Sequence, residues 1–168
     1  MVKWTFEDDC IAPQGRIKIE YRGKNPFGMV QKAKSIILRV FDIEQSGFWE
    51  RDFRWDISSD PRSFYIRYYA NKSLDMRSKV LGEVVFQGVQ PADPNKDGAL
   101  VIFIGAKLKT EFNLVKNFQK MPFYKGFLKI YNFAFYNKIR RQYIFECAKW
   151  VEQLNREFRL ALNVPNAK

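Results

Sequence analysis

The sequence predicts an α+β fold in which a curved antiparallel sheet wraps around a long C-terminal helix. Apolar residues recur at helical spacing from Tyr143 to Leu162, and neither Gly nor Pro occurs between Lys129 and Val164. Ahead of this helix, segments of alternating polarity are separated by turn residues, which indicates strands joined by short connections that pair antiparallel. The length is that of one folded unit, so we treat 1–168 as a single domain.

The N-terminal part is predicted to form strands followed by a helix. Residues 2–6 are a short strand candidate, and residues 16–22 alternate apolar and charged side chains as a half-buried strand does. Asn25 and Pro26 are residue types favoured at the N-cap and at the first helical position. The apolar spacing carries this helix to Phe41.

Four further strand candidates follow, each bounded by turn residues. They cover residues 48–57, 63–70, 79–90 and 99–112. Gly82 in the third would let a helix cross close to the sheet or would mark a bulge. The last strand is apolar on both faces in its first half, where Val101 and Phe103 point away from the predicted core. We expect a covering segment or a homodimer contact on that second face.

The chain is basic and rich in aromatic residues. It contains 29 Lys and Arg against 18 Asp and Glu, a net charge of +11 that favours nucleic acid, anionic lipid or acidic protein as partner. Its 16 Phe, 8 Tyr and 4 Trp suit a bulky core or an apolar cavity. The sequence has no His, which excludes Ser-His-Asp and Cys-His nucleophile systems and every metal site containing His.

Other enzyme chemistry has little support in the sequence. Acid–base catalysis would depend on carboxylates or tyrosines, and acidic pairs such as Asp52 and Asp56 fall on the polar face of a strand. The glycine spacings match no phosphate-binding loop, and residues 93–97 lack the Gly and Glu positions of a calcium-binding hand. We therefore predict no cofactor and no metal, and we favour a binding protein over an enzyme.

The two cysteines and the apolar runs bear on the cellular location. Cys10 and Cys147 are far apart in the sequence, and we interpret them as small buried residues in preference to a disulfide. No segment approaches the length of a membrane span, and the first residues lack the apolar run of a signal peptide. We expect a cytoplasmic protein, either free or peripheral at a membrane.

The order of elements resembles the START-like, or helix-grip, superfamily, which includes polyketide cyclase-like and lipid-transfer proteins. The resemblance covers about Arg16 to Leu162, includes the helix start at Asn25 and Pro26, and rests on element order. It implies binding or transport of a hydrophobic small molecule or lipid in a cavity between the sheet and the C-terminal helix. The candidate lining residues are Trp49, Arg51, Phe53, Trp55, Tyr68, Phe86, Tyr143 and Cys147.

Arg51 is the charged member of this set. The alternation of its strand places it on the same face as Trp49 and Phe53, where a cation needs a carboxylate, a phosphate or an aromatic ring. It would anchor an anionic ligand in the cavity. The alternatives are a structural ion pair or a strand register in which Arg51 reaches solvent. For the aromatic members, simple core packing is the alternative.

A second candidate surface is the basic and aromatic block from Lys107 to Arg141, in which Glu111 is the only acidic residue. Rings interleaved with lysines suit an anionic membrane surface. They also suit single-stranded nucleic acid, so a nucleic-acid-binding or protein-interaction module is the alternative function. A third interpretation places the rings in the core and the lysines in solvent. The candidate residues are Lys116, Lys120, Lys125, Lys129, Lys138, Arg140 and Arg141.

Overall fold

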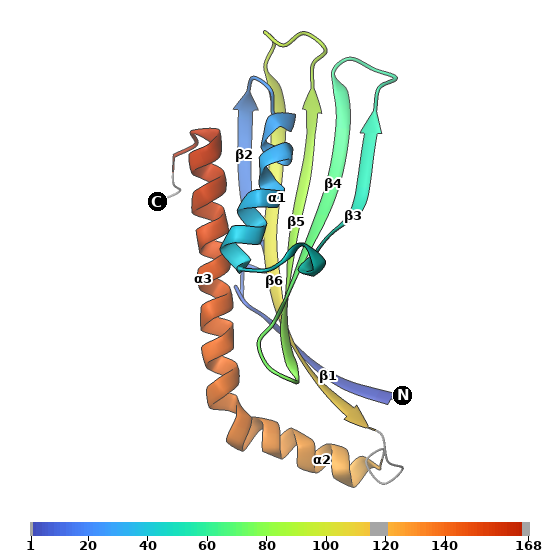
Figure 1. Ribbon diagram of the computed structural model, residues 1–168, viewed down its shortest axis with the longest axis vertical. Helices are drawn as coiled ribbons and strands as arrows, with labels where there is room; N and C mark the ends of the chain where they lie inside the picture. The colour runs from blue at the N-terminus through green and yellow to red at the C-terminus, as the bar shows by residue number, and fades with distance from the viewer. Residues whose placement is uncertain (1, 115–120, 166–168) are drawn as a thin grey trace.

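The computed structural model describes residues 2–114 and 121–165, and it has an α+β fold (Figure 1). An open, curved antiparallel sheet contains the strands β1 (Val2–Asp9), β2 (Ile17–Gly23), β3 (Phe48–Asp56), β4 (Arg62–Ser73), β5 (Ser78–Gln90) and β6 (Gly98–Leu114). The helices are α1 (Phe27–Phe41), α2 (Pro122–Tyr131) and α3 (Asn137–Leu162), with a π-helical segment, Asn132–Tyr136, before α3. The predicted fold class is confirmed.

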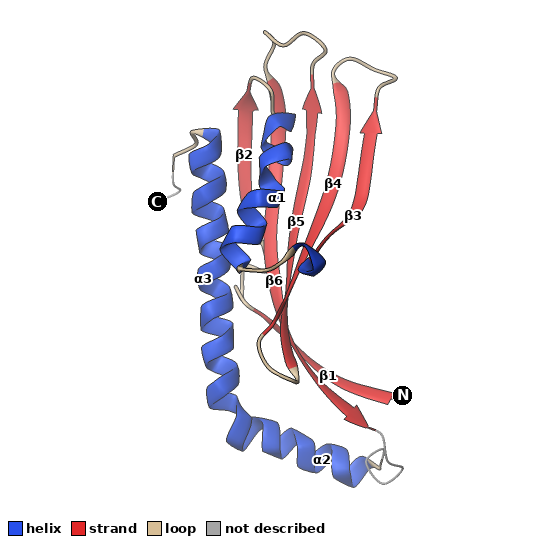
Figure 2. Cartoon of the chain, viewed as in Figure 1, coloured by secondary structure: helices blue, strands red, loops and turns tan. Residues whose placement is uncertain are grey.

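The long strand β6 organises the sheet. The strand order is β1-β6-β5-β4-β3, and β2 pairs with β6 on the same edge as β1. The two edge strands share β6 because they occupy different parts of it: β2 lies along Gly98–Ile104 and β1 along Lys107–Leu114. Helices α1 and α3 lie against one face of the sheet and contact each other, and within 2–114 and 121–165 the opposite face carries no helix (Figure 2).

The main core lies between this sheet face and the two helices. The apolar stripe of α3 that contacts the sheet consists of Cys147, Val151, Leu154 and Phe158, all of them fully buried. Burying a side chain the size of Leu or Phe contributes about 2 kcal/mol. Gly82 permits α1 to approach, because a Cβ at this position would lie 2.6 Å from Cζ of Phe41. The prediction that this glycine allows a helix to cross close to the sheet is confirmed.

The interpretation of the cysteines as two separate buried residues was wrong. Cys10 and Cys147 form a disulfide with their Cα atoms 5.7 Å apart, across a sequence separation of 137 residues. The end of β1 and the middle of α3 meet beside β6, where the backbone N–H of Cys10 also donates to the carbonyl of Ala106 at 3.0 Å. Distance along the chain did not indicate this pairing because the tertiary fold creates the contact.

Strand β3 departs from the predicted alternation. Its register with β4 shifts between Glu50 and Asp52, so Arg51 is an extra residue in a bulge. As a result Trp49 pairs with Tyr69 and lies on the helix-free face, whereas the residues after the bulge keep the predicted side. The prediction that Trp49, Arg51 and Phe53 share one face was wrong, because a bulge reverses the alternation.

Candidate functional site

Helix α2 lies across one end of the molecule, and its inner side is packed against the sheet (Figure 1). It begins at Pro122, whose fixed φ suits the first turn of a helix. Leu128 is buried on Phe112 of β6 in a small cluster that is separate from the main core. The partly buried members of this cluster are Trp4, Phe6 and Tyr124. These contacts fix α2 against the ends of β1 and β6.

A polar cluster, buried at Tyr136, Ser78 and Thr110, fixes the joint between α2 and α3. The hydroxyl of Tyr136, at the end of the π-helical segment, donates to Oδ2 of Asp75 at 2.7 Å and lies 2.6 Å from Oγ of Ser78. Ser78 also contacts the hydroxyl of Thr110 at 3.1 Å. Ser78 and Thr110 are almost fully buried, so these hydrogen bonds satisfy groups that water does not reach. The cluster joins the helices to the β4–β5 connection.

The ionisation of this cluster reflects its burial and its hydrogen bonds. Burial and the bond to the Asp75 carboxylate raise the pKa of Tyr136 to about 12. Burial acts to raise the pKa of Asp75, but the hydrogen bonds from Tyr136, the backbone and Tyr143 outweigh it and bring that pKa below its usual value. Tyr143, predicted to line a cavity, therefore belongs to this polar cluster, and burial followed by the bond to Asp75 raises its pKa.

An ion pair between Arg140 and Asp8 supports the first turn of α3. Nε of Arg140 donates to Oδ2 of Asp8 at 2.5 Å, and a second guanidinium nitrogen bonds to Oδ1 of the same carboxylate. The bond to Asp8 raises the pKa of Arg140. Arg140 was predicted to meet an anionic surface, but it forms an ion pair inside the protein because β1 brings the carboxylate of Asp8 to it.

The outer side of α2 and of the segment after it exposes large apolar side chains. The residues are Met121, Phe123, Phe127, Ile130 and Phe133, with exposed fractions from 58% for Met121 and Phe127 to 89% for Phe123. Phe123, Phe127 and Ile130 follow helical spacing and share one side of α2, opposite Leu128. We call these five residues, together with Lys125, Lys129, Lys138 and Arg141, the α2 surface.

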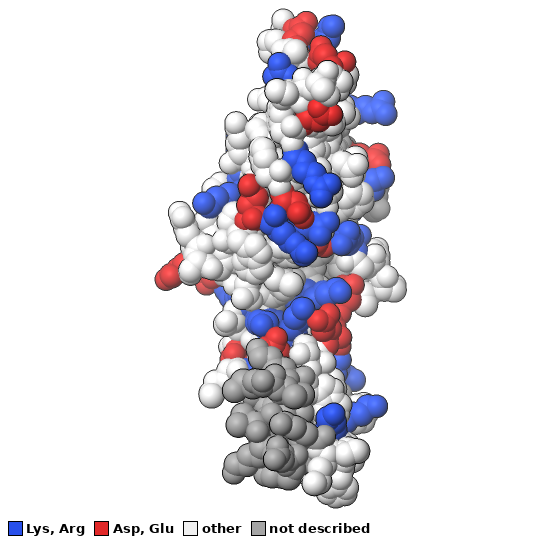
Figure 3. Space-filling model, turned by 90° about the vertical axis from the view of Figure 1, so that its right-hand side faces the viewer, with Lys and Arg blue, Asp and Glu red and all other residues white. Residues whose placement is uncertain are grey.

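The basic members of the α2 surface border this apolar stripe. Lys129, Lys138 and Arg141 are exposed, and Lys125 is half-buried. The predicted residues Lys116 and Lys120 lie outside the described residues. No acidic residue occurs between Glu111 and Glu146, so the sequence places no negative charge within this surface. On the side of the molecule seen in Figure 3, by contrast, acidic and basic side chains neighbour one another around the middle of its long axis.

A hollow of about 530 Å³ lies where the α2 surface continues onto α3. Its lining residues are Phe133, Ala134, Asn137, Lys138, Arg141, Gln142 and Phe145. The lining thus combines two cations with two aromatic rings, one of which, Phe145, is 62% exposed. This arrangement can hold an anionic group at its centre and apolar chains on either side.

The predicted cavity residues are distributed differently. Phe86 and Cys147 are fully buried in the main core, and Tyr68 is 7% exposed beside Phe48 and Phe86. Burial and the neighbouring Glu50 carboxylate raise the pKa of Tyr68 to about 12. None of the hollows that we describe opens between α3 and the sheet; Tyr68 and Phe86 contact neighbouring rings, and Cys147 forms the disulfide with Cys10.

The β3 residues of the predicted set lie away from α3. Trp55 packs on the ring of Phe27 with centroids 4.3 Å apart, and Phe53 is 52% exposed near the sheet edge. Arg51 reaches solvent and donates to the hydroxyl of Tyr69 at 3.1 Å. This agrees with the alternative interpretation, in which the strand register directs Arg51 to solvent and not into a cavity. The structure thus brings none of Trp49, Arg51 and Phe53 to the helix α3.

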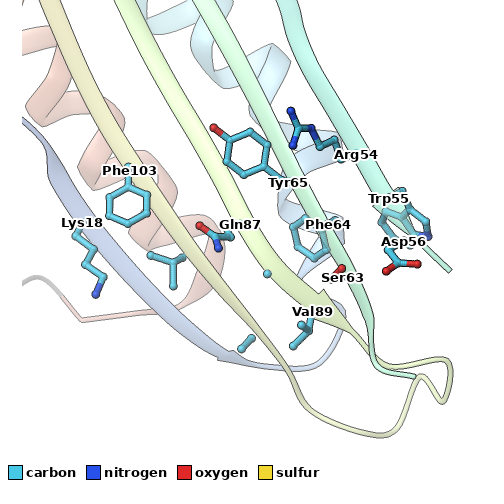
Figure 4. A pocket seen from close by; sticks show the side chains of 13 residues that line it. Lys18, Arg54, Trp55, Asp56, Ser63, Phe64, Tyr65, Gln87, Val89 and Phe103 are labelled. Atoms are coloured by element: carbon cyan, nitrogen blue, oxygen red, sulfur yellow. The ribbon is translucent and has the colours of Figure 1, made fainter. Parts of the chain in front are cut away.

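The helix-free face of the sheet carries a groove of about 930 Å³ at the end where β3 meets β4 (Figure 4). Val101 and Phe103 line it, and no described segment of the chain covers them. The sequence indicated this second apolar face, but it did not indicate that Lys18 and Arg54 border it.

The polar cluster near α2 was not predicted either. Nothing in the sequence connected Tyr136 with residues 75 and 78, because only the fold brings them together.

Comparisons with known proteins identify no family. No family model matches the chain, and no curated protein matches it. Among solved structures, one similar chain is a Staphylococcus aureus protein of unknown function, SA2116, at 11% identity and a TM-score of 0.18, with 84% of this chain and 96% of that chain covered. Within the described residues, no helix combines the length and the apolar character needed to cross a membrane.

Proposed function

We propose that this protein binds lipid at an anionic membrane surface and that the α2 surface is the part that enters the interface. The observation that carries the proposal is the row of exposed apolar side chains on α2 with cations beside it. A folded protein rarely leaves such large aromatic side chains together in water unless they meet a partner. The prediction of lipid binding is retained here, with its location moved from a cavity to the surface of the molecule.

The apolar stripe supplies the attraction to the lipid. Phe123, Phe127, Ile130 and Phe133 are each more than half exposed, so insertion would remove most of their surface from water. Burying one such side chain contributes about 2 kcal/mol, which makes a few of them sufficient for reversible association.

The basic residues give the preference for anionic lipid. Each Lys or Arg near an anionic leaflet contributes about 1 kcal/mol. Lys129, Lys138 and Arg141 are exposed on the same segment, and the sequence has no acidic residue between Glu111 and Glu146. Long basic side chains beside an apolar stripe can reach the headgroups while the rings enter the acyl region. The hollow between Phe133 and Phe145 then offers a place for a lipid phosphate.

The contacts behind α2 keep this surface in place. Leu128 holds the helix on β6, the Tyr136 hydroxyl holds the joint, and Arg140 holds the first turn of α3. An apolar stripe held by such contacts does not need to fold on binding, so less affinity is lost to ordering.

Vesicle co-sedimentation tests the proposal. We expect the protein to bind vesicles of phosphatidylcholine with phosphatidylserine more tightly than vesicles of phosphatidylcholine alone, and to bind less as salt rises. Replacing Phe123→Ser and Phe127→Ser together should weaken binding by at least about tenfold, because two buried rings are lost. The matched control is Phe53→Ser with Ile57→Ser, two exposed apolar residues on the other side of the molecule.

Two results would contradict the proposal. One is equal vesicle binding by the α2 variant and the wild-type protein. The other is tight, strongly salt-dependent binding of a single-stranded oligonucleotide by a protein that ignores vesicles, which would favour the nucleic-acid alternative.

A further inference from the structure

The groove on the helix-free face is a separate site from the α2 surface, and it is built by cross-strand neighbours. One row across β6, β5, β4 and β3 consists of Val101, Gln87, Tyr65 and Arg54. The next row begins with Lys18 and Phe103 on β2 and β6. Figure 4 shows Lys18 and Phe103 on one side of the groove and Tyr65 and Arg54 on the other. Both walls are therefore carried by hydrogen-bonded strands.

The floor of the groove is apolar although no helix covers it. Val101 and Phe103 are half-buried, and their remaining surface faces the hollow. The aromatic ring of Tyr65 lies across the groove from the Phe103 ring, with the exposed amide of Gln87 between them. A flat apolar molecule lying on this floor would remove that surface from water and would contact a ring on each side.

Arg54 supplies a cation at one wall. Its guanidinium lies 5.9 Å from the centroid of the Tyr65 ring. Within the described residues it has no carboxylate at ion-pair distance, whereas its neighbour Arg67 lies 3.4 Å from Asp52. Asp56 also lines the groove, and its carboxylate accepts hydrogen bonds from the backbone and hydroxyl of Ser58.

The cation on the opposite wall, Lys18, has a carboxylate beside it, unlike Arg54. Nζ of Lys18 lies 2.5 Å from the carboxylate of Glu20, so its charge is already compensated. The groove thus has one cation without a carboxylate partner, and it stands at the end of an apolar floor. A guanidinium in that position offers the paired N–H donors that match a carboxylate.

We infer that this groove binds a small amphipathic carboxylate with an aromatic body. The carboxylate meets the guanidinium of Arg54, and the aromatic body lies over Val101 and Phe103. The volume of about 930 Å³ is within the range of small-molecule sites. The charge complementarity selects an anion over a neutral molecule of the same shape.

Fluorescence titration with two pyrene probes tests the inference. Pyrenebutyrate carries the carboxylate, and pyrenebutanol has the same aromatic body without the charge. We expect saturable binding of pyrenebutyrate, weakened by about tenfold or more in Arg54→Gln, with little change for pyrenebutanol. The control is Arg62→Gln, an exposed arginine on β4 that does not line the groove, which should leave both affinities unchanged. Val101→Asp should weaken both probes, since it removes the apolar floor.

Three outcomes would overturn the inference. These are the absence of saturable pyrenebutyrate binding, equal affinity of the wild-type and Arg54→Gln proteins, and a homodimer in ultracentrifugation that Val101→Asp dissociates and pyrenebutyrate does not. The last outcome would assign the groove to a second copy of the chain. Because the titration concerns a different face, loss of vesicle binding in the α2 variant has no effect on its result.

Discussion

The hydroxyl of Tyr136 donates to Oδ2 of Asp75 at 2.7 Å, and this bond joins the C-terminal helices to the connection between β4 and β5. The residues are 61 positions apart in the sequence. Their contact fixes the point at which the chain turns from α2 into α3. The position of the exposed apolar stripe on α2 therefore depends on a polar cluster that lies behind it.

Replacing Tyr136→Phe should lower the free energy of unfolding by about 1–3 kcal/mol, because it removes a hydroxyl that bonds to the buried side chain of Ser78 and to the Asp75 carboxylate. Urea unfolding followed by circular dichroism measures this change. Tyr21→Phe is the control, since the Tyr21 hydroxyl donates to an exposed backbone carbonyl of Lys24 and its loss should have little effect. Equal stability of the two variants would show that the cluster does not hold the joint.

The stability of the protein should decrease in acid through Asp75. Its pKa is lower in the folded protein than in the unfolded chain, so its contribution is present above the unfolded value of about 4 and is lost as pH falls through the folded value. Asp75→Asn should flatten this part of the pH–stability curve, measured by urea unfolding between neutral pH and pH of about 2. Asp97→Asn, a change in the exposed β5–β6 loop, should leave the curve as in the wild type.

Removing the disulfide should destabilise the protein strongly. The chain-entropy model gives about 5 kcal/mol as the upper value for a loop of this length, and measured losses for native disulfides are about 2–5 kcal/mol. We expect Cys10→Ala with Cys147→Ala to lower the melting temperature, and a reducing agent to lower that of the wild type but not of the variant. Free thiols detected by mass spectrometry in unreduced, denatured protein would contradict the pairing.

Two glycine substitutions should act in opposite directions. Gly82→Ala should destabilise the protein by about 1–3 kcal/mol, because the new Cβ would meet the buried ring of Phe41. Gly126→Ala should stabilise α2 by about 1 kcal/mol, because no atom lies within 4 Å of the new Cβ and alanine favours a helix. Thermal unfolding of the two variants and the wild type provides the comparison. A stabilising Gly82→Ala would show that α1 does not approach the sheet here.

Local patterns were sufficient to predict most elements of the fold. Alternation within 63–70 and 99–112 and helical spacing from Tyr143 onward depend on neighbours in the sequence, and the structure contains β4, β6 and α3 there. The helix start was predicted to within one residue: Pro26 takes the N-cap position and α1 begins at Phe27, while the side chain of Asn25 accepts a hydrogen bond from the backbone N–H of Gly28. The β3 register was not predictable in this way, because a bulge depends on how two strands fit together.

The sequence by itself determined the fold class, the order of the elements, and the segment in which aromatic and basic residues concentrate, since each of these follows from composition and periodicity along the chain. The tertiary structure alone decided which of those side chains remain exposed, that Arg140 pairs with Asp8, and that Cys10 meets Cys147. The physical reason is that burial, ion pairing and disulfide formation depend on distances between residues far apart in the sequence, and folding sets those distances.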